Sequence, residues 1–102
     1  MIIRGGINIY PEEVEAVLRA HPAVHDAAVT GIASTERGEE IAAFVVLKAD
    51  APMPGVDALR AWCGERLAPY KHPRWIEILD ALPRNSSGKV VKKALAERAS
   101  IV

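Results

Sequence analysis

The feature that most constrains the fold of this chain is an uninterrupted run of seven hydrophobic residues, from Ile41 to Leu47. A strand with one face in water alternates apolar and polar side chains, whereas a strand covered on both faces can be apolar throughout. We therefore expect a strand over residues 41–48 in the centre of a sheet, with other elements packed on each face.

Two further strands are expected beside the central one. Residues 24–33 are apolar and become β-branched in their second half, and a polar turn that contains Gly38 follows them. Trp75 to Leu79 carries apolar residues on both sides of Glu77. Together with the central run, these segments predict a three-stranded sheet.

Three segments have helical features. Pro11 occupies a favoured first helical position, and acidic residues crowd the turn that follows it. Apolar or partly apolar residues then recur with helical spacing, at Val14, Val17, Leu18 and His21 in the first segment and at Val56, Leu59, Trp62, Cys63 and Leu67 in the second. A short final helix is expected over residues 91–99, with Leu95 as its apolar anchor.

The N-terminus predicts a small hairpin. Met1 to Arg4 and Asn8 to Tyr10 are predicted as short strands, joined by a turn at Gly5 and Gly6. The order of elements is then β-β-α-β-β-α-β-α. This order predicts one α+β domain over residues 1–102, in which an N-terminal two-stranded hairpin is followed by a three-stranded sheet with helices packed on it.

The composition excludes several classes of protein. Thirteen basic residues balance thirteen acidic ones, so bulk charge gives no reason to expect binding to nucleic acid or to an anionic membrane. No apolar run approaches the roughly 20 residues that span a bilayer. The single cysteine, Cys63, allows no internal disulfide and supports no zinc site. We expect no metal site in the chain and a reducing, cytoplasmic location.

The loop Pro83–Lys89 is the first candidate for chemistry. Its Gly88-Lys89 pair resembles the end of a phosphate-binding P-loop, but Pro83 occupies the place of the first glycine and Val90 that of the serine or threonine. What remains is a lysine at the tip of a polar loop that contains a glycine. This lysine either brings a positive charge to a substrate or is a solvated surface side chain, as most lysines are.

Two further stretches are candidates for binding. The segment Tyr70–Trp75 combines two aromatic residues with Lys71, His72 and Arg74, so it can hold a phosphate by charge and an adenine ring by stacking. The alternative is that these cations simply follow a helix end, where they are favoured. Gly5-Gly6 either admits a partner close to the backbone or forms a tight turn.

Four motifs in a fixed order carry a resemblance to a known family. They are Gly-Gly-x-Asn-Ile-Tyr-Pro-x-Glu-Val-Glu at 5–15, His-Pro-Ala-Val at 21–24, Tyr-Lys-x-Pro at 70–73 and Leu-Pro-Arg-Asn-x-x-Gly-Lys at 82–89. Over essentially the whole chain, this series resembles the C-terminal domain of the adenylate-forming enzymes. The Tyr-Pro-x-Glu form of the first motif is similar to the acyl-CoA and aryl-CoA synthetase branch, whereas peptide-synthetase domains more often carry Glu-Leu-Gly-Glu.

The resemblance implies the small lid domain of an AMP-forming carboxylate–CoA ligase, an enzyme of fatty-acid or related metabolism. In the first step of that reaction, a carboxylate attacks the α-phosphate of Mg-ATP to give an acyl-adenylate and pyrophosphate. The lid then turns, and the thiol of coenzyme A displaces AMP. By this resemblance Lys89 is the catalytic residue of the first step, with Arg84, Gly88 and Lys71 as supporting residues.

The second step gives the other motifs a role under the same resemblance. Gly5 and Gly6 match the loop that lines the channel for the pantetheine arm of coenzyme A. Tyr70 and His72 match positions that contact its nucleotide end in some relatives. Arg37 falls where several relatives have tryptophan, and we expect it to hold a phosphate there.

The resemblance also implies a partner. The relatives have a large N-terminal adenylation domain that binds ATP, Mg²⁺ and the acid. We therefore expect this chain to be the lid of a longer enzyme, inactive by itself and working with that domain. The alternatives are a stand-alone module that binds coenzyme A or a carrier protein, and an adenylation subdomain that acts with a carrier protein. The sequence leaves the acid and the thiol acceptor open.

Overall fold

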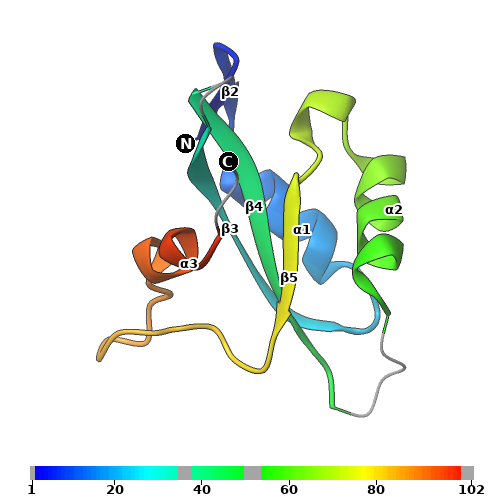
Figure 1. Ribbon diagram of the computed structural model, residues 1–102. Coiled ribbons are helices and arrows are strands. Elements are labelled where there is room, and N and C mark those ends of the chain that lie inside the picture. Colours follow the sequence, from blue (N-terminus) through cyan, green and yellow to red (C-terminus); the bar gives the residue numbers. More distant parts are fainter. Residues whose placement is uncertain (1, 35–37, 50–53, 100–102) are drawn as a thin grey trace.

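The elements follow the predicted order, with a short 3-10 helix added before the last strand (Figure 1). The structure is a computed structural model, and it describes residues 2–34, 38–49 and 54–99. The elements are β1 (Ile2–Arg4), β2 (Ile7–Ile9), α1 (Pro11–Arg19), β3 (Val24–Ser34), β4 (Gly38–Leu47), α2 (Val56–Arg66), η1 (Pro69–Lys71), β5 (Trp75–Leu79) and α3 (Lys92–Arg98).

Strand β4 is the centre of the sheet, as the apolar run predicts. Strand β3 lies antiparallel along one edge of β4 for its whole length, and β5 lies parallel along the other edge, from Trp75 beside Ala42 to Leu79 beside Val46. Before β5 begins, β1 occupies that same edge, because Arg4 pairs with Gly38. The predicted three-stranded sheet is therefore confirmed, and the hairpin of β1 and β2 extends it instead of standing apart.

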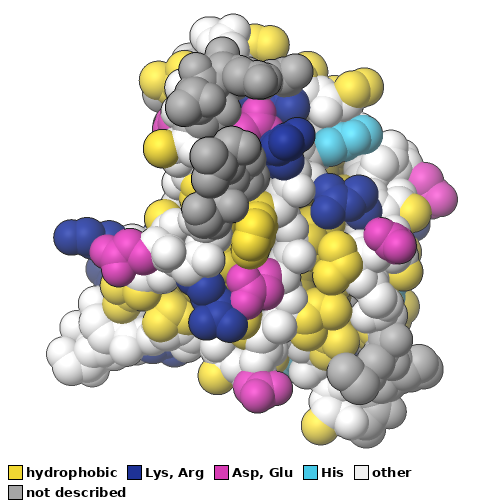
Figure 2. Space-filling model, in the orientation of Figure 1, with side chains coloured by type: hydrophobic (Ala, Val, Ile, Leu, Met, Phe, Trp, Pro, Cys, Tyr) yellow, Lys and Arg dark blue, Asp and Glu magenta, His cyan; other side chains and the backbone are white. Residues whose placement is uncertain are grey.

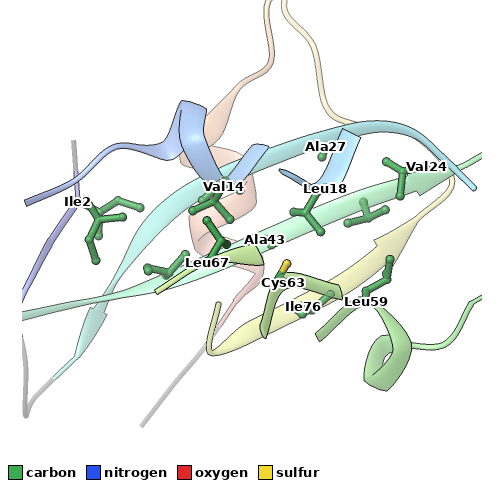
Figure 3. Packing of buried hydrophobic residues seen from close by; sticks show 14 residues of the cluster. Ile2, Val14, Leu18, Val24, Ala27, Ala43, Leu59, Cys63, Leu67 and Ile76 are labelled. Atoms are coloured by element: carbon green, nitrogen blue, oxygen red, sulfur yellow. The ribbon is translucent and has the colours of Figure 1, made fainter. Parts of the chain in front are cut away.

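Both faces of β4 are covered, and its side chains alternate between two cores. Ile41, Ala43 and Val45 face α1 and α2, where they join buried residues that include Val14, Leu18, Leu59 and Cys63 (Figure 3). Ala42 and Phe44 face α3, in a second cluster that also contains Ala28, Ile32, Leu82, Leu95 and Ala99. This double burial is the physical reason that the run contains no polar residue.

The outer edge of β3 is covered by side chains from α1. Arg19 Nη2 donates to the Ala27 carbonyl at 2.9 Å, and the Val29 amide donates to Glu15 Oε2 at 2.9 Å. Glu15 is buried, and Lys92 at the start of α3 reaches it with an Nζ–Oε2 distance of 3.1 Å. These contacts satisfy backbone groups that an open edge would offer to another strand.

Candidate functional site

The predicted site residues lie at opposite ends of the sheet. Arg4, next to Gly5, pairs with Gly38 at the start of β4, and the Lys89 loop contacts Asp26, which pairs with Val46 near the end of β4. Gly38 and Val46 are eight residues apart, which is about 26 Å along a strand. We call the first region, made of residues 3–10 and 70–74, the hairpin end; the second region is the Lys89 loop, residues 83–91 (Figure 1).

The Lys89 loop is closed by backbone hydrogen bonds. The Val91 amide donates to the Pro83 carbonyl at 2.8 Å, and Arg84 and Val90 form an isolated antiparallel bridge. At the tip, the Gly88 amide donates to the Asn85 carbonyl at 2.9 Å. Gly88 has a φ of +81°, a conformation that residues with a side chain rarely adopt, which explains the glycine before the lysine.

The peptide bond between Gly88 and Lys89 is hydrogen-bonded through both its carbonyl and its amide. Arg84 Nη1 donates to the Gly88 carbonyl at 2.8 Å, while Asn85 Oδ1 accepts from the Lys89 amide at 3.1 Å. The Lys89 side chain itself is exposed, and within the described residues it forms no ion pair. The loop therefore fixes the backbone of this lysine and leaves its ammonium group available to a ligand.

The turn at the hairpin end requires glycine for its own geometry. Arg4 pairs with Ile7, so Gly5 and Gly6 form a two-residue turn, and their φ values are +57° and +83°. Two positive φ angles are typical of the type I′ turn that suits a hairpin. A Cβ atom on either glycine would meet nothing within 4 Å, so the turn faces open space.

The segment after α2 is bound to this hairpin. Arg4 bridges the two parts, with Nη1 donating to the Tyr70 carbonyl at 3.0 Å and Nε donating to the buried carboxylate of Glu40 at 2.9 Å. The Tyr70 side chain remains exposed, together with Ile3, Ile7 and Tyr10. The structure thus brings Gly5, Gly6 and Tyr70 into one region, as a shared ligand would require.

Lys71 and His72 are less available to a ligand than Tyr70. Lys71 Nζ donates to Glu13 Oε2 at 2.7 Å, and this hydrogen bond raises the pKa of Lys71 above its ordinary value. His72 is half-buried, with Nε2 at 2.9 Å from the Leu67 carbonyl. Because a carbonyl oxygen only accepts, this contact assigns the proton to Nε2 and leaves Nδ1 for a ligand.

Arg74 is a cation that the sequence placed in the cluster without giving it a role. Its side chain is exposed and forms no ion pair or hydrogen bond within the described residues, unlike Arg4 and Lys71. Figure 2 shows basic side chains and a histidine gathered toward the hairpin end. Arg37, predicted to hold a phosphate, lies outside the described residues.

Other kinds of site find no support in the part of the chain that the structure describes. No group of three or more His, Cys, Asp or Glu side chains there is arranged to hold a metal ion. No helix in those residues is long and apolar enough to cross a bilayer. Cys63, a residue of α2, is buried in the core, and burial raises its pKa to about 11, so its thiol is not an effective nucleophile at neutral pH.

Comparison with known proteins identifies a family over most of the chain. Residues 13–89 match the AMP-binding enzyme C-terminal domain. A 2-succinylbenzoate–CoA ligase from Geobacillus kaustophilus is 50% identical over 95 residues, which are 93% of this chain but 19% of that protein. The chain therefore spans about a fifth of the length of this relative.

Two solved structures of one relative are similar in fold and sequence. They show o-succinylbenzoate CoA synthetase from Bacillus subtilis, once with the acyl-adenylate intermediate OSB-AMP and once as a double mutant with the product analogue OSB-NCoA. The first is 45% identical with a TM-score of 0.82, over 92% of this chain and 19% of that chain. The second is 44% identical with a TM-score of 0.82, over 96% and 19%.

Proposed function

Because this chain belongs to the AMP-binding enzyme C-terminal domain family, we propose that it is the lid of an AMP-forming carboxylate–CoA ligase and serves the two half-reactions with its two ends. The Lys89 loop serves formation of the acyl-adenylate. The hairpin end serves formation of the thioester with coenzyme A, after the lid has turned on the large N-terminal domain.

The observation that carries this proposal is the separation of the two regions. Along β4, about 26 Å separates Gly38 from Val46. Gly38 pairs with Arg4 in the hairpin end, and Val46 pairs with Asp26, which the Lys89 loop contacts. Groups that far apart cannot touch the same reacting atoms in one orientation of the domain. If both regions act at one active centre, the domain must present first one end and then the other.

The chemistry of the first step suits an exposed lysine on a fixed backbone. The carboxylate oxygen forms a bond to the α-phosphorus of ATP, and the bond to pyrophosphate breaks. Both reactants are anions, so a positive charge aimed at the reacting oxygens stabilises the transition state. Lys89 supplies that charge on a long flexible stem, and the charge leaves the centre when the loop is withdrawn. Mg²⁺ would accompany ATP on the large domain.

The second step uses the surface of the hairpin end. The thiol of coenzyme A attacks the acyl carbonyl carbon, and AMP leaves. Gly5 and Gly6 give the thin pantetheine arm room, Tyr70, His72 and Arg74 bind the nucleotide end of coenzyme A, and Arg37 contributes a further positive charge for its phosphate. The exposed Ile3, Ile7 and Tyr10 provide the apolar contact with the large domain.

A chimera tests the proposal without knowledge of the natural acid. The matching 95 residues of the Geobacillus relative are replaced by this chain, and 2-succinylbenzoate is supplied. We expect exchange of pyrophosphate with ATP that depends on the acid and falls sharply when the chain is omitted. A folded chimera without exchange would overturn the proposal. Binding of coenzyme A by that inactive protein would favour the stand-alone binding module.

A substitution at Gly5 tests whether the glycines only form the turn or also give the pantetheine arm room. Asn-Gly is a preferred pair for a type I′ turn, so Gly5→Asn keeps the hairpin and adds bulk at its tip. We expect the chimera with Gly5→Asn to retain acyl-adenylate formation and to form thioester from supplied acyl-adenylate about tenfold more slowly. Both rates are measured on one preparation, and equal thioester rates would mean that the glycines serve only the turn.

A further inference from the structure

The geometry points to Asp26 as a positioning residue for the catalytic lysine, acting through Arg84. This inference rests on the role proposed for Lys89. Asp26 lies on β3, far from Lys89 in the sequence, and belongs to none of the motifs that suggested a function. It is tied to the Lys89 loop by one guanidinium group.

Arg84 connects the strand to the lysine in two steps. Its Nη2 donates to Asp26 Oδ2 at 2.5 Å, and its Nη1 donates to the Gly88 carbonyl at 2.8 Å. This carbonyl and the amide nitrogen of Lys89 belong to the same peptide bond. A guanidinium group is planar and rigid. The position in which Asp26 holds Arg84 therefore sets the orientation of the Gly88–Lys89 peptide bond.

Asp26 is itself fixed by neighbours on the strand and the helix. Its Oδ1 accepts from the Ala27 amide at 2.8 Å and from Arg19 Nε on α1 at 3.3 Å. The carboxylate therefore has one oxygen bound to the body of the domain and one bound to the loop. The tip of the loop, residues 84–89, has no buried side chain, whereas Val90 behind it packs against the core, so the bond from Arg84 to Asp26 ties the tip to the body of the domain.

A role in folding alone is a poor explanation for this pair. The side chains of Arg84 and Asp26 are 46% and 21% exposed, and such surface pairs contribute little to folding. The chain also offers a matched pair that is not connected to the loop. Arg98 on α3 donates to Glu77 on β5 at 2.6 Å, with exposures of 55% and 24%.

The test compares the two pairs in the active chimera. Asp26→Asn removes the charge that holds Arg84 and keeps the size of the side chain. We expect it to lower kcat for acyl-adenylate formation about tenfold, with KM for ATP and the acid nearly unchanged, since misplacement of a catalytic group mainly affects the transition state. Glu77→Gln is expected to leave both half-reactions within about twofold of the parent.

A double-mutant cycle then separates positioning from a general structural effect. If Asp26 acts through Arg84, Asp26→Ala changes the rate by less than about twofold when Arg84 is already alanine. Equal losses in both half-reactions, or an effect of Asp26→Ala that is undiminished in the Arg84→Ala background, would overturn the inference. Failure of Lys89→Ala to slow adenylation would instead refute the proposed function, so the two failures are distinguishable.

Discussion

Replacing Lys89 by alanine is expected to slow acyl-adenylate formation by about 100-fold or more, as the loss of one electrostatic contact in a transition state does. The backbone of the loop should not change, because the hydrogen bonds around Lys89 use its amide and carbonyl groups and not its side chain. Thioester formation from supplied acyl-adenylate should stay within about threefold, since we propose that the hairpin end, and not the Lys89 loop, serves that step. Pyrophosphate exchange and thioester release in the chimera measure the two rates.

The control for Lys89 is another exposed lysine of the same domain. Lys93 lies four residues further on, in α3, and takes no part in the Lys89 loop. We expect Lys93→Ala to leave both rates near those of the parent. If Lys89→Ala lowered both half-reactions equally, or if Lys93→Ala matched its effect, Lys89 would not have the role that we propose.

Replacing Phe44 by alanine is expected to cost about 3–5 kcal/mol of unfolding free energy, the usual range for a buried phenylalanine. Phe44 is fully buried, and it is the largest residue of the cluster between the sheet and α3. A small domain has about 5–15 kcal/mol in total, so this loss is a large fraction of the margin. The loss also bears on function, because α3 directly follows the Lys89 loop.

Denaturant unfolding of the 102-residue chain measures this effect. Trp75 packs against the same cluster, so its fluorescence reports the transition. Phe44→Leu, which keeps most of the volume, should cost about 1 kcal/mol. Ile3→Ala, at a residue that is 46% exposed, should cost less than about 0.5 kcal/mol. A midpoint for Phe44→Ala equal to that of Ile3→Ala would show that this core contributes little to stability.

The two candidate regions show how much of the site the sequence could predict. It placed Gly5, Gly6, Tyr70, His72 and Lys89 in loops, and the structure finds each of them outside the strands and the α-helices. The sequence did not indicate which residues bind these loops to the rest of the domain. Asp26 and Glu13 meet Arg84 and Lys71 across 58 residues of chain, and no local pattern reports such a contact.

The sequence by itself determined the order of the strands and α-helices and the burial of β4, because periodicity and turn chemistry are properties of neighbouring residues. Only the tertiary structure decided that β5 runs parallel to β4, that β1 joins the same edge, and that the two candidate regions lie at opposite ends. The packing also leaves the Arg74 side chain without an ion pair within the described residues, whereas Lys71 forms an ion pair with Glu13. These outcomes depend on how distant segments pack against one another, and packing is fixed by the whole core at once.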